Sequence, residues 1–354
     1  MFRAVLMLAV CQLVLAQYGS QYSSNYGNQR YESHQEAYRR IGDIVQEKTT
    51  SWKAGVYPKP LSHFYTGLTV SPTSKNLMTH RTPIGILLSM PEQLPESFDA
   101  RTKWPECKSI RTIRNQGCCG SCYAISAAST MSDRWCIHSP NHESFSFGAY
   151  DLMSCCRSCG NGCHGGDLPP VWEYWVEKGI SSGGPYNSNK GCHSYPVDVC
   201  DPADPEMFEA PKCSRSCQSG FNATMASQDR RYGSKAYAVA DDEEHIMSEI
   251  MTNGPVQAAF DVYVDFKAYK SGVYRHVWGP RDGGHAVKII GWGVENINGA
   301  PVKYWLAANS WGQEWGENGY FRFVRGEDHC GIESYMFAGL PDYKKHMQLD
   351  GYNY

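Results

Sequence analysis

Apolar residues recur at three- and four-residue intervals in two stretches of the first half of the chain. Within Tyr31–Lys48, the spacing of Ile41, Ile44 and Val45 predicts a helix. A second helix is predicted over Cys122–Trp135, where the apolar positions are Ala124, Ile125, Ala128, Met131 and Trp135. Helical structure is therefore expected to dominate the first half.

The pattern changes after about Pro255 to period-two runs such as Ala286–Gly291 and Tyr320–Val324. Gly-Gly, Asn-Gly and Gly-Glu pairs separate these runs and are typical of turns between strands. The second half is therefore predicted to be rich in sheet. A chain that is helical first and sheet-rich later has the α+β pattern, and no internal repeat is visible.

The N-terminus carries an apolar run, Ala4–Ala16, which is followed by polar sequence. The run is too short for a bilayer, which needs roughly 20 apolar residues, and it ends on a small residue. Residues 1–16 are therefore predicted to be a signal peptide that is removed after Ala16. No later stretch is long and apolar enough for a transmembrane helix, so no membrane partner is expected.

Residues 17–93 differ in composition from the rest of the chain. This segment contains no cysteine, starts with low-hydrophobicity sequence, and carries five prolines between Lys53 and Pro91 that favour extended chain: Pro58, Pro60, Pro72, Pro83 and Pro91. From Leu94 onward the sequence is rich in Trp, Cys and Gly. A segment that cannot form its own core is expected to lie on the next domain.

The net charge and the cysteine content limit the partners and the cellular compartment that can be expected. The formal net charge is −3 without a basic block, which argues against nucleic acid or an anionic membrane surface as a partner. Fifteen cysteines are too many for an ordinary cytosolic enzyme, and all but Cys11 lie between Cys107 and Cys330. We therefore expect a disulfide-rich protein of the secretory pathway, either secreted or lysosomal.

The motif with the clearest chemistry is Gln116-Gly117-Cys118-Cys119-Gly120-Ser121-Cys122-Tyr123, which leads into the second predicted helix. A thiol at a helix N-terminus feels the positive end of the helix dipole, which favours the nucleophilic thiolate. Cys122 is therefore a candidate nucleophile. On position alone, it could equally be one more disulfide cysteine.

The pattern Cys-Gly-Ser-Cys-Tyr resembles the signature of the papain family, and more narrowly of cathepsin B-like proteases. The resemblance extends over Leu94–Leu340 and includes these stretches: Leu94–Arg101, Cys155-Cys156, Gly162–Gly166, Lys270–Tyr274 and Asp328–Ser334. It implies a two-domain fold, with a helical left domain, an antiparallel β-barrel-like right domain and the active site in the cleft between them. It also implies peptide hydrolysis through an acyl-enzyme thioester, without cofactor or metal.

The resemblance assigns the base to His285, in Gly283-Gly284-His285-Ala286-Val287, and its orienting partner to Asn309. A histidine taken at random is more often a surface or core residue, but this motif reverses that reading. Trp311 would shield the hydrogen bond between the two from water. His285 lies 163 residues after Cys122, beyond the roughly 130–150 typical of papain-like enzymes, and Gly183–Cys217 is the candidate insertion.

The same resemblance places further residues around the substrate. Gln116 and the Cys122 N–H would form the oxyanion hole, and the substrate-binding residues would be Gly165, Gly166, Gly284, Trp311 and Tyr335. The two glycines at 165 and 166 would admit an extended substrate backbone, although a plain turn explains them equally well.

The cathepsin B-like framework implies five disulfides: Cys107–Cys136, Cys119–Cys163, Cys155–Cys213, Cys156–Cys159 and Cys192–Cys217. It leaves Cys118, Cys200 and Cys330 without assigned partners, and a Cys118–Cys200 bridge is one option. A zinc site over Cys155–Cys163 is the less favoured alternative, because secreted cysteines are usually paired.

The resemblance also implies a zymogen. Residues 17–93, with Thr50-Ser51-Trp52-Lys53-Ala54-Gly55, would be an inhibitory propeptide lying through the cleft, residues 94–340 the protease domain, and residues 341–354 a polar tail. The implied partners are protein and peptide substrates, the propeptide itself and cystatin-like inhibitors, and the enzyme is expected to be a monomer.

Asn222-Ala223-Thr224 is a candidate glycosylation site. Tyr304–Gly316 resembles digestive enzymes of blood-feeding worms.

Two departures from cathepsin B-like enzymes predict specificity. Tyr335 stands where a glutamate receives arginine two residues before the cut bond (P2), so aromatic or aliphatic side chains are expected there instead of basic ones. The loop Cys192–Cys217 lacks the paired histidines that hold a substrate's C-terminus and instead carries four acidic residues: Asp201, Asp204, Glu206 and Glu209. Asn115 replaces an aspartate that ties one of those histidines down.

These departures predict an endopeptidase with weak removal of C-terminal dipeptides. An alternative function is a non-catalytic protein on the same scaffold that binds a partner through the cleft. Such relatives lack the nucleophilic cysteine.

Overall fold

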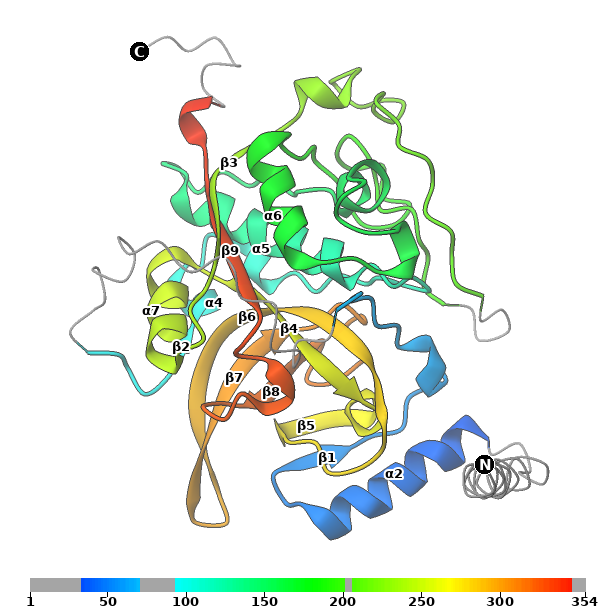
Figure 1. The fold of residues 1–354 in the computed structure, drawn as a ribbon, viewed down its shortest axis with the longest axis vertical. Coiled ribbons are helices and arrows are strands. Elements are labelled where there is room, and N and C mark those ends of the chain that lie inside the picture. Colours follow the sequence, from blue (N-terminus) through cyan, green and yellow to red (C-terminus); the bar gives the residue numbers. More distant parts are fainter. Residues whose placement is uncertain (1–32, 71–92, 201–205, 346–354) are drawn as a thin grey trace, which may run out of the picture.

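A computed structural model describes residues 33–70, 93–200 and 206–345 (Figure 1). The predicted signal peptide and most of the predicted tail lie outside these ranges. The helices are α2 (His34–Lys48), α4 (Ala100–Lys103), α5 (Cys122–His138), α6 (Leu168–Glu177) and α7 (Glu243–Asn253). None of the helices in these ranges combines the length and apolar character that crossing a membrane requires.

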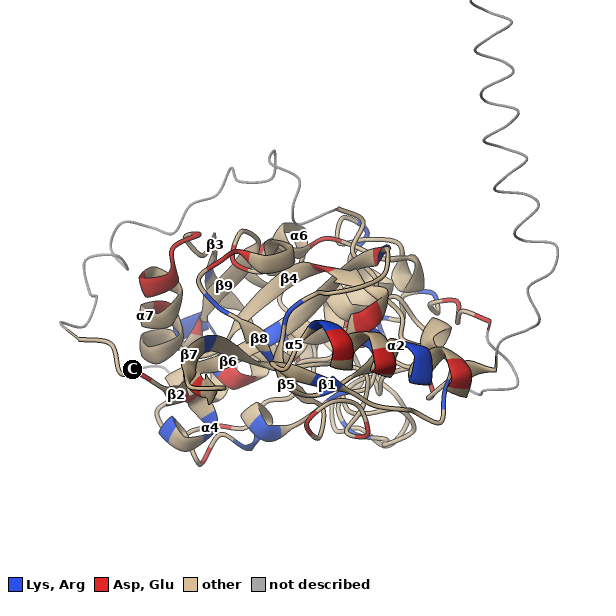
Figure 2. Ribbon diagram, turned by 90° about the horizontal axis from the view of Figure 1, so that it is seen from below, with Lys and Arg blue, Asp and Glu red and all other residues tan. Residues whose placement is uncertain are grey.

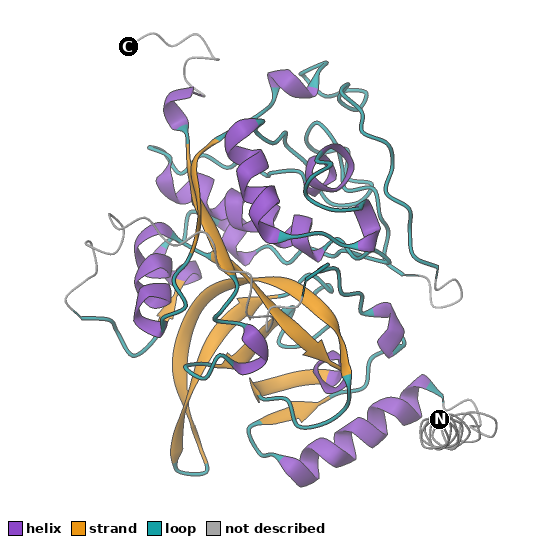
Figure 3. Cartoon of the chain, viewed as in Figure 1, coloured by secondary structure: helices purple, strands orange, loops and turns teal. Residues whose placement is uncertain are grey.

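Most of the strands belong to the second half of the chain, as the period-two pattern predicts. They are β1 (Trp52–Ala54), β2 (Phe98–Asp99), β3 (Gly233–Ala238), β4 (Val256–Tyr263), β5 (Tyr269–Tyr274), β6 (Arg281–Ile297), β7 (Ala300–Ala308), β8 (Tyr320–Val324) and β9 (Met336–Pro341). Figure 3 shows the helices α5 and α6 grouped to one side of these strands. The fold is therefore mixed α+β, as predicted.

The strands form one sheet in the order β1-β5-β8-β7-β6-β4-β9-β3, with β2 paired to β6. Most pairs are antiparallel, but β5 and β8 run parallel. Within the residues described, no pairing closes the sheet between β1 and β3. The barrel-like sheet expected from the sequence is thus an open, mixed sheet here.

Two main apolar clusters fill the interior. One is built mainly on the sheet and includes Phe260, Phe266, Trp305 and Phe321. The other surrounds α5 and α6, and it draws residues from β4, β6 and β9 as well. Because α5 is buried along almost its whole length, it is a central helix and not an amphipathic surface helix.

The N-terminal segment, which we define as residues 33–70, lies along the sheet. Its helix α2 starts with a capping box between Ser33 and Glu36, and it buries Tyr38, Ile41 and Val45. Strand β1 then adds antiparallel to β5 at one edge of the sheet. Acidic and basic residues are interspersed along α2 (Figure 2). The predicted inability of this segment to form its own core agrees with its position on the sheet.

The start of the predicted polar tail is packed against the protein. Strand β9 continues to Pro341, and the ring of Tyr343 lies 4.2 Å from that of Trp135. The Tyr343 hydroxyl donates a hydrogen bond to the Trp135 carbonyl. Residues 341–343, at the start of the predicted tail, therefore contact the rest of the protein.

Candidate active site

The Cys122 thiol lies at the first residue of α5, where the helix dipole is positive. The thiol is completely buried, and the backbone N–H of Ala286 approaches its Sγ atom at 3.4 Å. Ala286 directly follows His285 on β6. The first turn of α5 and the buried middle of β6 thus bring the two residues together across 163 positions of sequence.

The His285 imidazole is oriented by an amide. Its Nε2 atom lies 2.8 Å from Oδ1 of Asn309, which follows the end of β7. The Trp311 ring stacks on the imidazole with centroids 4.6 Å apart. Nδ1 of His285 has no hydrogen-bond partner within the ranges described, so it is the nitrogen left for proton exchange.

Gln116 is held beside the thiol by polar contacts at both ends of its amide. Its Oε1 accepts a hydrogen bond from Ser310 Oγ at 2.6 Å. Its Nε2 donates to the Cys119 carbonyl at 2.8 Å and to the Tyr65 carbonyl at 3.1 Å. The Gln116 side chain is therefore held in place, and its amide N–H points at the Tyr65 carbonyl of the N-terminal segment.

Residues 65–70 of the N-terminal segment cover this site. The N–H groups of Gly67 and Leu68 donate to the Gly284 carbonyl at 3.1 and 3.0 Å, and Thr69 N–H donates to the Gly166 carbonyl at 3.0 Å. Gly166 N–H in turn donates to Gly67. A Cβ atom on Gly166 would lie 2.3 Å from the Cys159 carbonyl oxygen, so glycine is required there.

Covering the site keeps both reactive groups neutral. Burial raises the pKa of the Cys122 thiol to about 12, against the opposing effect of nearby N–H groups, Ala286 first among them. Burial also lowers the pKa of His285 to about 4, although the hydrogen bond that His285 donates to Asn309 opposes the change. In the covered site burial therefore favours the neutral thiol and the neutral imidazole over their charged forms.

A model of the papain family of cysteine proteases matches residues 94–340. The chain belongs to the papain family of cysteine proteases. The family predicted from Cys-Gly-Ser-Cys-Tyr is thereby confirmed. This protease is 48% identical over 257 residues to cathepsin B-like cysteine proteinase 6 of Caenorhabditis elegans, an alignment that covers 70% of this chain and 67% of the relative. It is 49% identical over 256 residues to a cathepsin B-like cysteine proteinase of Schistosoma japonicum, covering 70% and 73%.

Solved structures of proforms share the fold. Procathepsin B S9 from Trypanosoma congolense is 38% identical and superposes with a TM-score of 0.71, covering 86% of this chain and 97% of the other. The proform of the ragweed pollen protease Amb a 11, at 20% identity and a TM-score of 0.66, has the same fold and covers 93% of each chain. The chain is thus a cathepsin B-like cysteine protease with a papain-like fold, and both of these solved structures are proforms.

The protease holds six disulfides in the part of the chain that the structure describes. Five are the pairs implied by the family framework, namely Cys107–Cys136, Cys119–Cys163, Cys155–Cys213, Cys156–Cys159 and Cys192–Cys217. The sixth joins Cys118 to Cys200, so Cys122 and Cys330 are the free thiols of these ranges. The cysteines of the alternative zinc site are all disulfide-bonded, which leaves no thiolate there for a metal.

The Tyr335 phenol, which was predicted to contact substrate, lies against a residue that sequence reasoning missed. Its hydroxyl donates to Asp167 Oδ1 at 2.6 Å. Asp167 directly follows Gly166, and it caps α6 through a bond from Leu168 N–H at 2.8 Å. An aspartate just before a helix with two early prolines is a recognisable N-cap, but its neighbour Tyr335 lies 168 positions away.

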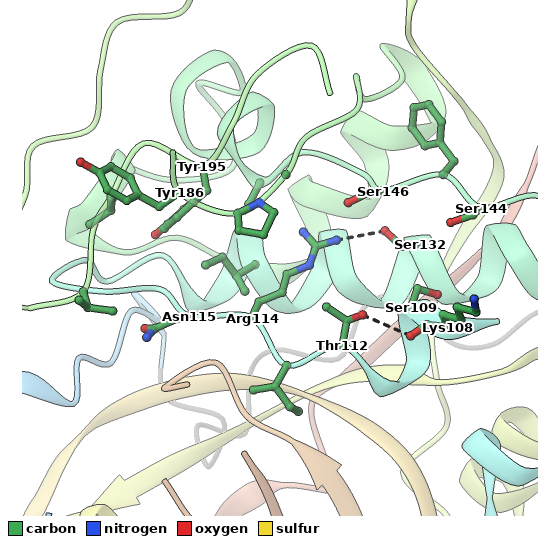
Figure 4. A pocket seen from close by; sticks show the side chains of 18 of the residues that line it. Lys108, Ser109, Thr112, Arg114, Asn115, Ser132, Ser144, Ser146, Tyr186 and Tyr195 are labelled. Carbon is green, nitrogen blue, oxygen red and sulfur yellow. Dashed lines mark hydrogen bonds between the residues drawn. The ribbon is translucent and has the colours of Figure 1, made fainter. Parts of the chain in front are cut away.

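A separate cavity of about 470 Å³ lies beside α5 in the protease (Figure 4). Its lining includes Ile125, Phe145 and Tyr195 but neither Cys122 nor His285. The Tyr195 hydroxyl donates to the Gln116 carbonyl at 2.8 Å and lies 2.6 Å from Ser121 Oγ. This wall of the cavity therefore supports the loop that carries Gln116.

Proposed function

We propose that the protein is an endopeptidase made as a zymogen, with Cys122 as nucleophile, His285 as base and Asn309 as the residue that orients the base. The observation that carries this proposal is the position of the Cys122 sulfur, 3.4 Å from the N–H that follows His285, beside an imidazole bonded to Asn309. Cleft walls would come from the apolar clusters around α5 and the sheet.

In the proposed reaction the Cys122 thiolate attacks a peptide carbonyl, and the carbonyl oxygen becomes an oxyanion. Gln116 Nε2 and the Cys122 N–H would stabilise that charge, since the Gln116 amide is already fixed toward a carbonyl. The imidazolium of His285 then donates its proton to the leaving amine, which departs and leaves a thioester. His285 next removes a proton from water, which cleaves the thioester and regenerates the thiol.

We further propose that residues 17–93 are the inhibitory propeptide. Leu68 pairs in parallel with Gly166 and antiparallel with Gly284, which supports a chain that lies through the cleft. The family resemblance implies that a substrate chain runs in the direction opposite to that of the covering segment. The carbonyl groups of the covering segment would then not have the orientation that attack by Cys122 requires. The mature chain would then begin close to Leu94, and N-terminal sequencing after acid activation tests this.

Replacing Phe64 with alanine is expected to open the covered site. The Phe64 ring is fully buried and packs on Trp311 with centroids 5.1 Å apart. Loss of a buried phenylalanine costs about 3–5 kcal/mol, so labelling of Cys122 in the full chain should accelerate by at least about 100-fold. The rate of modification by a small thiol reagent at neutral pH measures this.

The matched control is Val56→Ala, which removes an apolar side chain of the same segment that is 54% exposed. This control should change the labelling rate by less than about twofold. Equal rates for the Phe64→Ala and Val56→Ala chains would mean that the segment does not limit access to Cys122.

Peptides with amidated C-termini are expected to be cut at least as fast as those with free C-termini. Glu206 and Glu209 are exposed, and Glu209 pairs with His164 at 2.8 Å, whereas Asp201 and Asp204 lie outside the described residues. Acidic residues repel a terminal carboxylate, with partial screening by solvent. Matched peptides in the two forms provide the measurement, and strong preference for the free acid, with sequential release of dipeptides, would contradict it.

The proposed function as a whole is tested by an epoxysuccinyl thiol inhibitor applied after acid processing. We expect one adduct per chain, located at Cys122 by mass spectrometry, together with loss of peptide cleavage. An unmodified Cys122 in the processed chain would favour the alternative of a non-catalytic binding protein.

Several finer expectations remain part of the proposal. The N-terminal apolar run supports targeting to the secretory pathway, with a secreted or lysosomal destination, and digestion of ingested protein is one role consistent with it. Asn222 and Thr224 are both exposed, which supports a glycan at Asn222. A monomer inhibited by cystatin-like proteins is the partner arrangement that the family resemblance implies.

A further inference from the structure

Leu68 of the covering segment packs against the apolar cluster that contains Ala286, Ala259 and Tyr335. These three residues lie side by side, because Ala259 pairs with Ala286 between β4 and β6, and Ala259 N–H donates to the Tyr335 carbonyl at 3.0 Å. The backbone of Leu68 pairs with Gly166 and Gly284.

A carboxylate is hydrogen-bonded to Tyr335. Asp167 is the neighbour in sequence of Gly166, and its Oδ1 atom lies 2.6 Å from the Tyr335 hydroxyl. Asp167 is half-buried, whereas Tyr335 is almost completely buried. The Asp167 side chain thus keeps part of its surface accessible, and it directly follows the glycine that pairs with Leu68.

The hydrogen bonds of Asp167 leave one oxygen available. Both the Leu168 N–H and the Tyr335 hydroxyl donate to Oδ1, and no group in the described ranges bonds to Oδ2 or forms an ion pair with this carboxylate. Burial and the Asp167 carboxylate raise the pKa of Tyr335, so the phenol remains a donor. The apolar residues around Leu68 and Tyr335 are thus bordered by a carboxylate that has no counter-ion in the described ranges.

We propose that Asp167 is a specificity-determining residue that binds an arginine or lysine side chain at P2 of the substrate through its free oxygen. The proposal rests on the proposed protease function. It also replaces the expectation that basic side chains are rejected, because that expectation assumed that the glutamate missing at Tyr335 left the pocket without a carboxylate. The apolar walls, which accept Leu68, allow aromatic and aliphatic side chains as well.

The test compares two peptides that differ only in arginine or phenylalanine at P2, cleaved by the processed full-length enzyme. The wild-type protein should cleave both. Asp167→Asn should lower kcat/KM for the arginine peptide by about tenfold or more, mainly through KM, because an amide cannot neutralise a guanidinium. The phenylalanine peptide should change by less than about threefold, since asparagine caps a helix as well as aspartate does.

A control variant separates the alternatives. Asp242→Asn alters an equivalent cap on α7 and should affect neither peptide. An equal loss for both peptides in Asp167→Asn, or a wild-type enzyme that cuts only the phenylalanine peptide, overturns the inference. If neither peptide is cut and Cys122 resists the epoxysuccinyl inhibitor, the proposed function itself fails.

Discussion

Replacing Cys122 with alanine is expected to lower kcat/KM for a peptide substrate by at least about 10⁴-fold. The variant removes the only sulfur that lies beside the His285–Asn309 pair within the described residues. Because this variant could not process itself, its propeptide should be removed with another protease before the assay. The measurement is the initial rate of peptide cleavage relative to the wild-type enzyme treated identically.

Cys330→Ala is the matched control, since Cys330 is the other free thiol of the described ranges. Burial and nearby carboxylates, Asp265 first among them, raise the pKa of Cys330 to about 12. Cys330 is therefore expected to remain a neutral thiol that takes no part in the reaction. This variant should keep its activity within about twofold of wild type. A fully active Cys122→Ala enzyme, or an inactive Cys330→Ala enzyme, would refute the assignment of the nucleophile.

Replacing Arg134 with methionine is expected to destabilise the proform by about 3–5 kcal/mol. The guanidinium is fully buried in α5 and pairs with Glu249 at 2.7 Å. It also donates to the carbonyls of Pro255, Gly254 and Gly339 at 2.6, 2.9 and 3.1 Å. The variant leaves a buried carboxylate without its cation and three carbonyls without these donors, and the free energy of unfolding in urea measures the loss.

Arg275→Met is the control for this prediction. Arg275 pairs with Glu327 at 2.5 Å, but both side chains are over 40% exposed. Exposed pairs contribute about 0–1 kcal/mol because water screens them. Similar decreases in the free energy of unfolding for the two variants would show that burial does not strengthen the Arg134–Glu249 pair, which would contradict this prediction.

Local pattern predicted the helix α5 well, but not the environment of its polar residues. Spacing of apolar side chains located the helix to within three residues at its C-terminal end. Asp133 and Arg134, however, are as buried as those apolar residues. Their partners Lys288 and Glu249 lie 155 and 115 positions away, so only the tertiary fold reveals that the charges are paired.

The residues of the candidate site form the same two groups: those that a local motif predicts and those that only the tertiary fold reveals. Cys122, His285, Asn309 and Gln116 were predicted because each stands in a short motif that the family resemblance carries. Asp167 stands in no such motif, and the role proposed for it depends on Tyr335, which belongs to a different part of the chain. The Cys118–Cys200 bridge likewise stayed one option among several, since the number of cysteines does not determine which are close.

The six disulfides have a consequence for a protein that is itself exposed to proteases. Cys200 is joined to Cys118, and Cys213 is joined to Cys155, so both flanks of the stretch between Cys200 and Cys213 are tied back to the part of the chain that contains Cys122. A nick in this stretch would divide the polypeptide into two chains but release neither. The enzyme would migrate as one band without reductant and as two bands with it, while the residues around Cys122 and His285 kept their covalent connection.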